Sequence, residues 1–301
     1  NLFHATTDED VVARELLLKP GDKWSEDLLN ESARNLRSYL FVSVARIIPC
    51  KGSTSDHVIA LVVTKDLWSL RLNSEFSYVG SKLEALELEF TEENLAGRNK
   101  HASIDFGMNL ASAYLGQQYR DPRLMGTQLQ LGERADLIWN RSSGKLEGGV
   151  ANLAVEQPLY TLDTRWGWAG SVEYRKDVYR FFSGGDIARV LFPSTGETLP
   201  YAFNRERLDL KAALVNSQGR LEKRNLSFGY RAFVKDNEMP ASTPAVQQAT
   251  LDAFAASILP RTESAGFLFM GYRKFRAEFV QLIDVNTFAL TEDYRLGLAL
   301  A

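Results

Sequence analysis

The stretch LELEFTEENLAGRNKHASIDFGMNL, residues 86–110, contains two segments in which apolar and polar residues alternate. Leu86, Leu88 and Phe90 alternate with polar residues in the first segment, and residues 103–110 repeat the pattern. A period of two predicts strands that have one apolar and one polar face. Segments of about ten residues that follow one another through turns are typical of a transmembrane β-barrel.

The same alternation continues through the rest of the chain after Leu67. It predicts about eleven strands in an all-β antiparallel arrangement. We expect these strands near 67–77, 84–94, 101–112, 114–121, 126–140, 145–157, 165–177, 205–216, 221–235, 267–283 and 292–301.

The breaks between these strands fall into a short class and a long class. Short turns on one side of a membrane and longer loops on the other are typical of outer-membrane barrels. The second long break contains a segment, residues 245–259, that we expect to form a short helix. The short breaks are 94–100, 121–126, 158–163 and 284–291, and the long ones are 178–204 and 236–266.

The composition limits the functional classes. Apolar residues make up 45% of the 301 residues, which is enough for a packed core or a lipid-facing surface. The formal net charge of −3 gives no support to nucleic-acid binding. The single cysteine, Cys50, excludes an internal disulfide. No run of about 18 apolar residues is present, so we expect no transmembrane helix.

Residues 1–66 have a different pattern, which predicts a small domain of two helices and two strands. Ser25 can cap a helix that extends to about Tyr39, after a shorter helix that Pro20-Gly21 ends. Strands are expected at 41–48 and 57–63, with the stub of another at Leu2-Phe3.

These residues resemble a known module. The segment VVARELLLKPGDKWSEDLLNESARNLRSYLF, residues 11–41, resembles a POTRA domain, the periplasmic module of the BamA/TamA outer-membrane assembly family, also called the bacterial surface antigen family. The resemblance implies an α+β fold in the order β-α-α-β-β, of which the first strand is incomplete here. It assigns residues 1–66 to the POTRA domain and 67–301 to an outer-membrane β-barrel.

Four later segments resemble barrel elements of the same family, in the same order. The family barrel has sixteen strands, so we expect this chain to carry a barrel truncated at its C-terminus. The family's inward loop with an Arg-Gly-aromatic element would lie beyond residue 301. The segments are TKDLWSLRLNSEF (64–76), FTEENLAGRNKHASIDF (90–106), GQQYRDPRLMGTQLQLG (116–132) and EFVQLIDVNTFALTEDYRLGLAL (278–300).

No arrangement of residues predicts catalysis. The three histidines, His4, His57 and His101, lack metal-ligand spacing, so we expect no metal, and no cofactor motif is present. Glu87 and Glu89 share one strand face, where they could do acid–base chemistry or line a water-filled lumen, and we prefer the lumen. We therefore expect no enzyme activity.

The resemblance implies a protein in the bacterial outer membrane, with the POTRA domain in the periplasm. The expected partners are outer-membrane client polypeptides or accessory assembly proteins, and the lipid bilayer with its lipopolysaccharide. Clients would add to an exposed POTRA strand edge by β-augmentation and enter through a weakly paired barrel seam. The predicted client-binding edge is Phe41, Val42, Ser43, Val44, Ala45 and Arg46, and the predicted seam residues are Trp68, Leu70, Leu72 and Asn73.

The function expected from this is that of an insertase or translocase of outer-membrane proteins. Two other classes remain open. One is a passive outer-membrane pore, or a membrane anchor for a partner domain. The other is a soluble β-rich binding protein, which dependence on detergent would distinguish from both membrane proteins.

Overall fold

The structure is a computed structural model that describes residues 5–240 and 243–300. Its main feature is an 11-stranded antiparallel sheet in the order β19-β16-β15-β14-β9-β8-β7-β6-β5-β4-β3. The strands are β3 (Leu70–Val79), β4 (Lys82–Glu92), β5 (His101–Met108), β6 (Ser112–Asp121), β7 (Gln130–Asn140), β8 (Leu146–Gln157), β9 (Trp166–Arg180), β14 (Ala202–Gln218), β15 (Glu222–Glu238), β16 (Glu263–Arg276) and β19 (Ala299–Leu300).

The predicted antiparallel strands from 67–77 to 221–235 are confirmed as β3 to β9, β14 and β15. The prediction for 267–283 was wrong in its second half. β16 ends at Arg276, and β17 (Phe279–Ile283) leaves the sheet to pair with β18 (Thr291–Arg295). The chain then returns to β16, where Ala299 pairs with Phe275. The break arises because the Leu296 N–H bonds to the Glu278 carbonyl and so closes a separate hairpin.

The segment before Leu67, called here the N-terminal unit, contains α1 (Glu9–Ala13), α2 (Glu26–Arg37), β1 (Val42–Lys51) and β2 (Val58–Asp66). Ser25 caps α2 as predicted, because its Oγ accepts a hydrogen bond from the Leu28 N–H at 3.4 Å. The predicted strand stub at Leu2-Phe3 lies outside the described residues. A small core holds the helices on β1, and its buried members are Leu36, Phe41, Val42 and Ala45.

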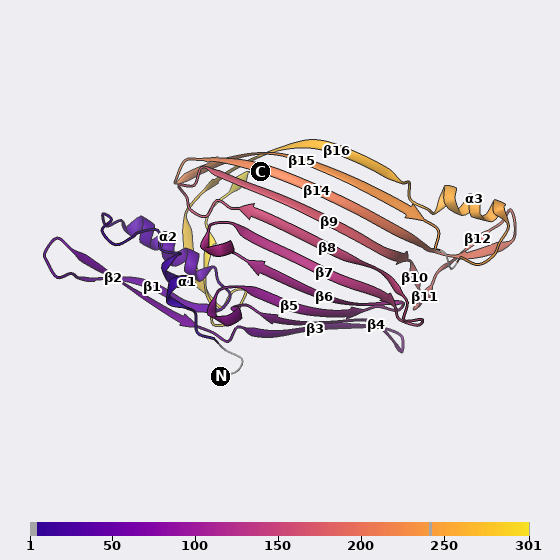
Figure 1. The fold of residues 1–301 in the computed structure, drawn as a ribbon, viewed down its shortest axis with the longest axis horizontal. Coiled ribbons are helices and arrows are strands. Elements are labelled where there is room, and N and C mark those ends of the chain that lie inside the picture. Colours follow the sequence, from indigo (N-terminus) through magenta and orange to yellow (C-terminus); the bar gives the residue numbers. More distant parts are fainter. Residues whose placement is uncertain (1–4, 241–242, 301) are drawn as a thin grey trace.

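The N-terminal unit and a second small substructure lie at opposite ends of the large curved sheet (Figure 1). The second substructure, called the cap, combines β12 (Arg189–Phe192) and β13 (Glu197–Pro200) with α3 (Gln248–Ser257). α3 confirms the helix expected within 245–259, whereas β12, β13 and the short strands β10 (Phe182–Ser183) and β11 (Asp186–Ile187) were not predicted. Phe192, Leu199 and Phe254 form the buried core of the cap.

The turns at the end of the sheet nearest the N-terminal unit are short. Two of them contain the 3-10 turns η1 (Leu95–Gly97) and η2 (Leu124–Gly126). Gly97 has a φ of +73°, and a Cβ there would lie 2.4 Å from the Thr6 carbonyl oxygen. Glycine at this position therefore allows the start of the N-terminal unit to approach the turn closely.

Candidate functional site

The strand register separates apolar and charged side chains onto opposite faces of the sheet. Leu88 pairs with Phe106 and Phe90 with Ile104, whereas Glu89 pairs with Asp105. Since side chains alternate between faces, each of these pairs shares one face. Ile104 is 59% exposed and its neighbour Asp105 is 6% exposed. We call the two surfaces the apolar face and the charged face.

The apolar face extends across the whole sheet. Leu115 pairs with Leu137 on β6 and β7. On β15 and β16 the corresponding pairs are Phe228 with Met270 and Tyr230 with Leu268. Leu268 is 84% exposed and Met270 is 70% exposed. A continuous exposed apolar surface of this extent marks a surface that contacts lipid or another protein.

The charged face carries three aspartates that are held by arginines, namely Asp136, Asp177 and Asp209. Arg134 Nε donates to both Asp136 carboxylate oxygens at 3.0 Å. Gly116 makes room for this pair, because a Cβ there would lie 2.3 Å from Asp136 Oδ1.

The same arrangement recurs two strands further along. Asp177 on β9 accepts from Arg175 Nε at 2.9 Å and from Arg205 Nη2 at 2.8 Å. Asp209 on β14 is paired with Arg207 and with Arg231, whose Nε lies 2.9 Å from Oδ1. The Arg205–Asp177 and Arg231–Asp209 pairs cross from strand to strand, and the other pairs join residues of one strand, so the face is charged but locally neutralised.

The sign of charge changes across this face. Glu75, Glu87, Glu89 and Asp105 make the side formed by β3, β4 and β5 acidic. Basic side chains predominate on β14, β15 and β16, where two of them lie against aromatic rings. Lys211 Nζ is 5.7 Å from the centre of the Phe269 ring, and the Arg273 guanidinium is 5.2 Å from that of Phe275.

The N-terminal unit is bound directly to the turns at its end of the sheet. The Asp8 N–H donates to the Gly97 carbonyl at 3.0 Å. Arg98 Nη1 lies 2.9 Å from Asp8 Oδ2 and 2.8 Å from Asp10 Oδ1. In the next turn Arg123 forms a buried two-point ion pair with Glu15. The hydrogen bonds that Arg123 donates to Glu15 raise the pKa of the Arg123 guanidinium above its usual value.

Helix α2 contacts the next turn through a buried carboxylate. Glu31 Oε1 accepts from the Leu162 N–H at 2.5 Å, and the Leu162 carbonyl accepts from Lys223 Nζ at 2.6 Å. Burial raises the pKa of the Glu31 carboxyl, although the Leu162 N–H opposes this. At the end of α2, Arg37 pairs with Asp293 of the β17–β18 hairpin. The two helices therefore bridge successive turns.

No family model matches the chain, and the search of curated proteins found no match. The solved structures that resemble it include the following two. The first is BamA from Haemophilus ducreyi lacking POTRA domains 1–3, at 14% identity and a TM-score of 0.46, over 77% of this chain and 49% of that one. The second is CdiB from Acinetobacter baumannii, at 12% identity and a TM-score of 0.45, over 96% of this chain and 56% of that one. The chain thus spans about half the length of each.

The predicted client-binding edge, residues 41–46, lies in β1 and just before it. Phe41, Val42 and Ala45 are buried in the small core, and Ser43 Oγ donates to the Lys65 carbonyl. β1 pairs only with β2 among the described strands. The role of residues 41–46 as a client-binding edge stays a prediction.

The hydrogen-bond alternation of β1 shows which of its amides face the open side. The Gly52 N–H bonds to the His57 carbonyl, and the register is unbroken from Lys51 back to Val44. Bonding toward the partner alternates along an antiparallel strand, so Val44 directs its N–H toward β2. Ala45 and Ile47 direct theirs away from β2. Pro49, also on this side, has no N–H, which is typical of an edge strand.

The predicted seam residues lie at the margin of the large sheet. β3 is the last strand of that sheet and pairs only with β4 among the described residues. Leu72 is on the apolar face, and Asn73 Nδ2 donates to Glu89 Oε2 at 2.9 Å on the charged face. Leu70 begins the strand and Trp68 precedes it. Their role as a seam stays a prediction.

Neither a metal cluster nor a spanning helix was found in the described ranges. They hold no group of three or more His, Cys, Asp or Glu side chains that could bind a metal ion. None of their helices is long and apolar enough to cross a membrane. His57 and His101 lie apart and bond to Asp56 and Glu93. His4 is outside the described residues.

Sequence reasoning missed the residues that bind the N-terminal unit to the sheet. Glu15, Glu31 and Arg123 were not singled out. No sequence signal singled out Glu31, because its neighbours on the helix surface include the polar residues Asp27, Arg34 and Asn35. Its partner, a backbone amide 131 positions away, was not predictable.

Proposed function

We propose that the chain is part of an outer-membrane protein that inserts or translocates client polypeptides, with its sheet in the bilayer and its N-terminal unit in the periplasm. The observation that carries this proposal is the separation of the two faces. One face is apolar and exposed on every long strand, and the other carries paired charges. Such a sheet suits a barrel with lipid outside and water inside.

The edges of the sheet support a role in handling extended chains. Among the described residues, β3 has a partner on one side only, and β16 is paired on its outer side only at Lys274 and Phe275. Unpaired backbone groups in the hydrocarbon region cost several kcal/mol each. The two edges therefore need further strands, and a client strand can supply pairing of this kind.

The N-terminal unit supports the same role. Its sequence resembles a POTRA domain, and its two helices contact successive turns of the sheet. A unit fixed there would present the open side of β1 to chains that approach this end. In this proposal no ionisable group acts as a catalyst, so the protein is not an enzyme.

The proposal is tested first by topology. Cys50 is replaced by Ser, and single cysteines are placed at Phe106 or Leu88 on the apolar face and at Asp105 or Glu87 on the charged face. In a reconstituted bilayer, a membrane-impermeant maleimide should label the charged-face positions rapidly and leave the other two protected. Rapid labelling at 88 and 106 with protection at 87 and 105 would contradict the membrane arrangement.

The role in client handling needs a second assay. Cells depleted of the protein should accumulate unassembled outer-membrane or secreted clients, and re-expression should restore client assembly.

The paired charges of the charged face also favour a second candidate, a passive pore. Ion conductance in planar bilayers without any effect of depletion on client assembly would favour the pore.

A further inference from the structure

The hairpin of β1 and β2 carries an exposed apolar surface on the side that faces away from the helices. Its register places Ile48 directly opposite Leu61. Paired residues of antiparallel strands share one face and lie in contact distance, so the side chains at every second position form one continuous surface, called here the outer face. Its apolar members are Ile48, Ile59, Leu61 and Val63, which are 43%, 56%, 48% and 39% exposed, and Arg46, Cys50 and Lys65 lie on it beside them.

The opposite face of the same two strands shows what such a surface packs against. Ala45 and Val62 lie on that opposite face, where they pack in the small core with Leu36 of α2. A sheet buries an apolar face against another element, and α2 does this on one side only. Among the described residues, no element covers the outer face, although its strands are as apolar there. Exposed apolar surfaces of this kind mark interaction sites.

The charges on the outer face have one sign. Arg46 and Lys65 lie on it, and both side chains are exposed. No ion pair of either cation was found among the described residues. The two acids of the hairpin are placed elsewhere, because Asp56 is in its turn and Asp66 accepts from the Thr7 N–H at 2.7 Å. The outer face therefore combines an apolar surface with uncompensated positive charge.

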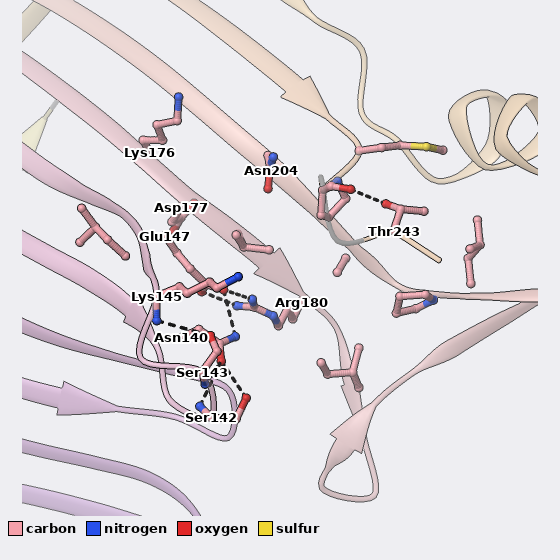
Figure 2. Close-up of a pocket in the computed structure, with 18 of the residues that line it drawn as sticks. Asn140, Ser142, Ser143, Lys145, Glu147, Lys176, Asp177, Arg180, Asn204 and Thr243 are labelled. Atoms are coloured by element: carbon pink, nitrogen blue, oxygen red, sulfur yellow. Dashed lines mark hydrogen bonds and ion pairs between the residues drawn. The ribbon is translucent and has the colours of Figure 1, made fainter. Parts of the chain in front are cut away.

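Buried charges at the other end of the molecule do not have this property. In a crevice of about 710 Å³ near the cap, Glu147 is paired with Arg180 and also accepts from Asn140 Nδ2 at 3.0 Å (Figure 2). This carboxylate and this guanidinium neutralise each other, so neither needs a ligand. The cations of the outer face instead favour a ligand that brings its own acidic groups.

The direction of the hairpin distinguishes a polypeptide from a membrane as that ligand. β1 and β2 point away from the large sheet (Figure 1). A bilayer around the sheet, as proposed above, would therefore not reach the outer face. An anionic lipid surface is the less suitable ligand for this reason, and an acidic polypeptide remains.

The chemistry of the outer face favours a helix. The backbone N–H and C=O groups of β1 lie along its edge, so the outer face offers side chains only. A helix satisfies its own backbone hydrogen bonds and presents an apolar stripe, as α2 does on the opposite side. We propose that the outer face docks an amphipathic helix of a partner polypeptide, in which acidic residues flank the apolar stripe and pair with Arg46 and Lys65.

The test uses the full chain in phosphatidylcholine nanodiscs, with a fluorescent peptide as the probe and fluorescence anisotropy as the readout. The stretch from Arg46 to Cys50 covers about 14 Å, which matches about three turns of an α-helix. The peptide therefore carries leucines at i, i+3, i+4 and i+7 with glutamates on both sides, and a hydrocarbon staple on its far side keeps it helical. Empty nanodiscs provide the blank.

The peptide should bind saturably, and variants of the outer face should weaken its binding. Leu61→Ala should weaken it about tenfold, because it shortens an apolar side chain that docking buries. Arg46→Gln should weaken it roughly two- to fivefold, as expected for an exposed ion pair. Leu40→Ala and Lys23→Gln are the matched controls, since both side chains are exposed and lie off the outer face, and they should leave binding unchanged.

A second peptide with lysines in place of the glutamates separates specific docking from general adhesion. It should bind the parent chain more weakly, and the double variant Arg46→Glu, Lys65→Glu should reverse this preference. Equal binding of the two peptides, no saturable binding, or an equal loss in Leu40→Ala and Leu61→Ala would overturn the proposal. Displacement of the acidic peptide by phosphatidylglycerol vesicles would also overturn it, in favour of a lipid-binding surface. Docking does not require the client-handling role, so these outcomes leave that role standing.

Discussion

Arg37 and Asp293 form a buried ion pair although 256 positions separate them in the chain. Arg37 Nε donates to Asp293 Oδ2 at 2.7 Å, and Nη2 donates to Oδ1 at 2.9 Å. Their side chains are only 7% and 10% exposed. The pair joins α2 to β18, and the Arg34 guanidinium lies 4.1 Å above the centre of the Phe279 ring of β17. The β17–β18 hairpin is therefore fixed to the N-terminal unit.

Asp293→Ala should strongly weaken this attachment. Removing one partner of a buried pair leaves an uncompensated charge, which costs about 3–5 kcal/mol. Hydrogen exchange should show faster exchange of β17 and β18 amides, with no change in β6 to β8. Glu222→Gln, which breaks the exposed pair with Lys274, is the control and should cost about 0–1 kcal/mol. Unchanged exchange in the hairpin of Asp293→Ala would show that the pair does not hold it.

Glu31 should make stability depend on pH in a defined direction. Its pKa is raised above the ordinary 4.5 by burial, so the carboxylate is less favourable in the folded state than in the unfolded state. The contribution of Glu31 to folding stability is therefore most favourable below pH 4.5, and it is lost as the pH rises through the raised pKa of the folded state.

Glu31→Gln removes this dependence and can keep the hydrogen bond from the Leu162 N–H. The variant should be more stable than the parent at about pH 7, and the difference should vanish below the ordinary pKa. Thermal unfolding of both proteins across this pH range measures the difference. A variant that is less stable by a constant amount at every pH would refute the prediction.

Phe106→Arg tests the assignment of the apolar face by stability. A charged residue on a lipid-facing strand position costs about 2–4 kcal/mol near the middle of the bilayer. Glu87→Arg, on the charged face of β4, should cost much less, because that side chain faces water and lies opposite Glu75. Urea titration of the protein in bilayers measures both. Equal costs would mean that the two faces do not differ in environment.

Leu36→Ala should destabilise the N-terminal unit by about 2–5 kcal/mol, as expected for a large-to-small change in a core. Leu36 is 1% exposed and packs with Phe41 and Ala45. Leu40→Ala is the control, because Leu40 is exposed and lies outside this core. If the two variants unfold at the same denaturant concentration, the core does not depend on α2 as described.

Much of the sheet was predictable because the alternation in residues 86–110 is a local property of the chain. The same signal failed at 277–278, because alternation continues from β16 into β17 and does not show where the neighbouring strand ends. The pairing of β1 with β2 was predictable as a hairpin, but its bulge after Val42 was not. Because the Val44 N–H faces β2, proline at Val44 would break the β1–β2 ladder and would not test the open edge.

Ile47 is the position at which backbone recognition by β1 can be tested. Its N–H faces away from β2, so proline there removes a donor from the open edge without removing one from the β1–β2 ladder. Ile47→Ala shortens the same side chain and keeps the N–H, which makes it the matched control. A lost hydrogen bond of about 0.5–1.5 kcal/mol should weaken binding of an extended client peptide roughly two- to tenfold in Ile47→Pro. In depleted cells that express each variant, client assembly should be lower with Ile47→Pro than with Ile47→Ala. Equal loss in both variants would show that the side chain, and not the backbone edge, is recognised.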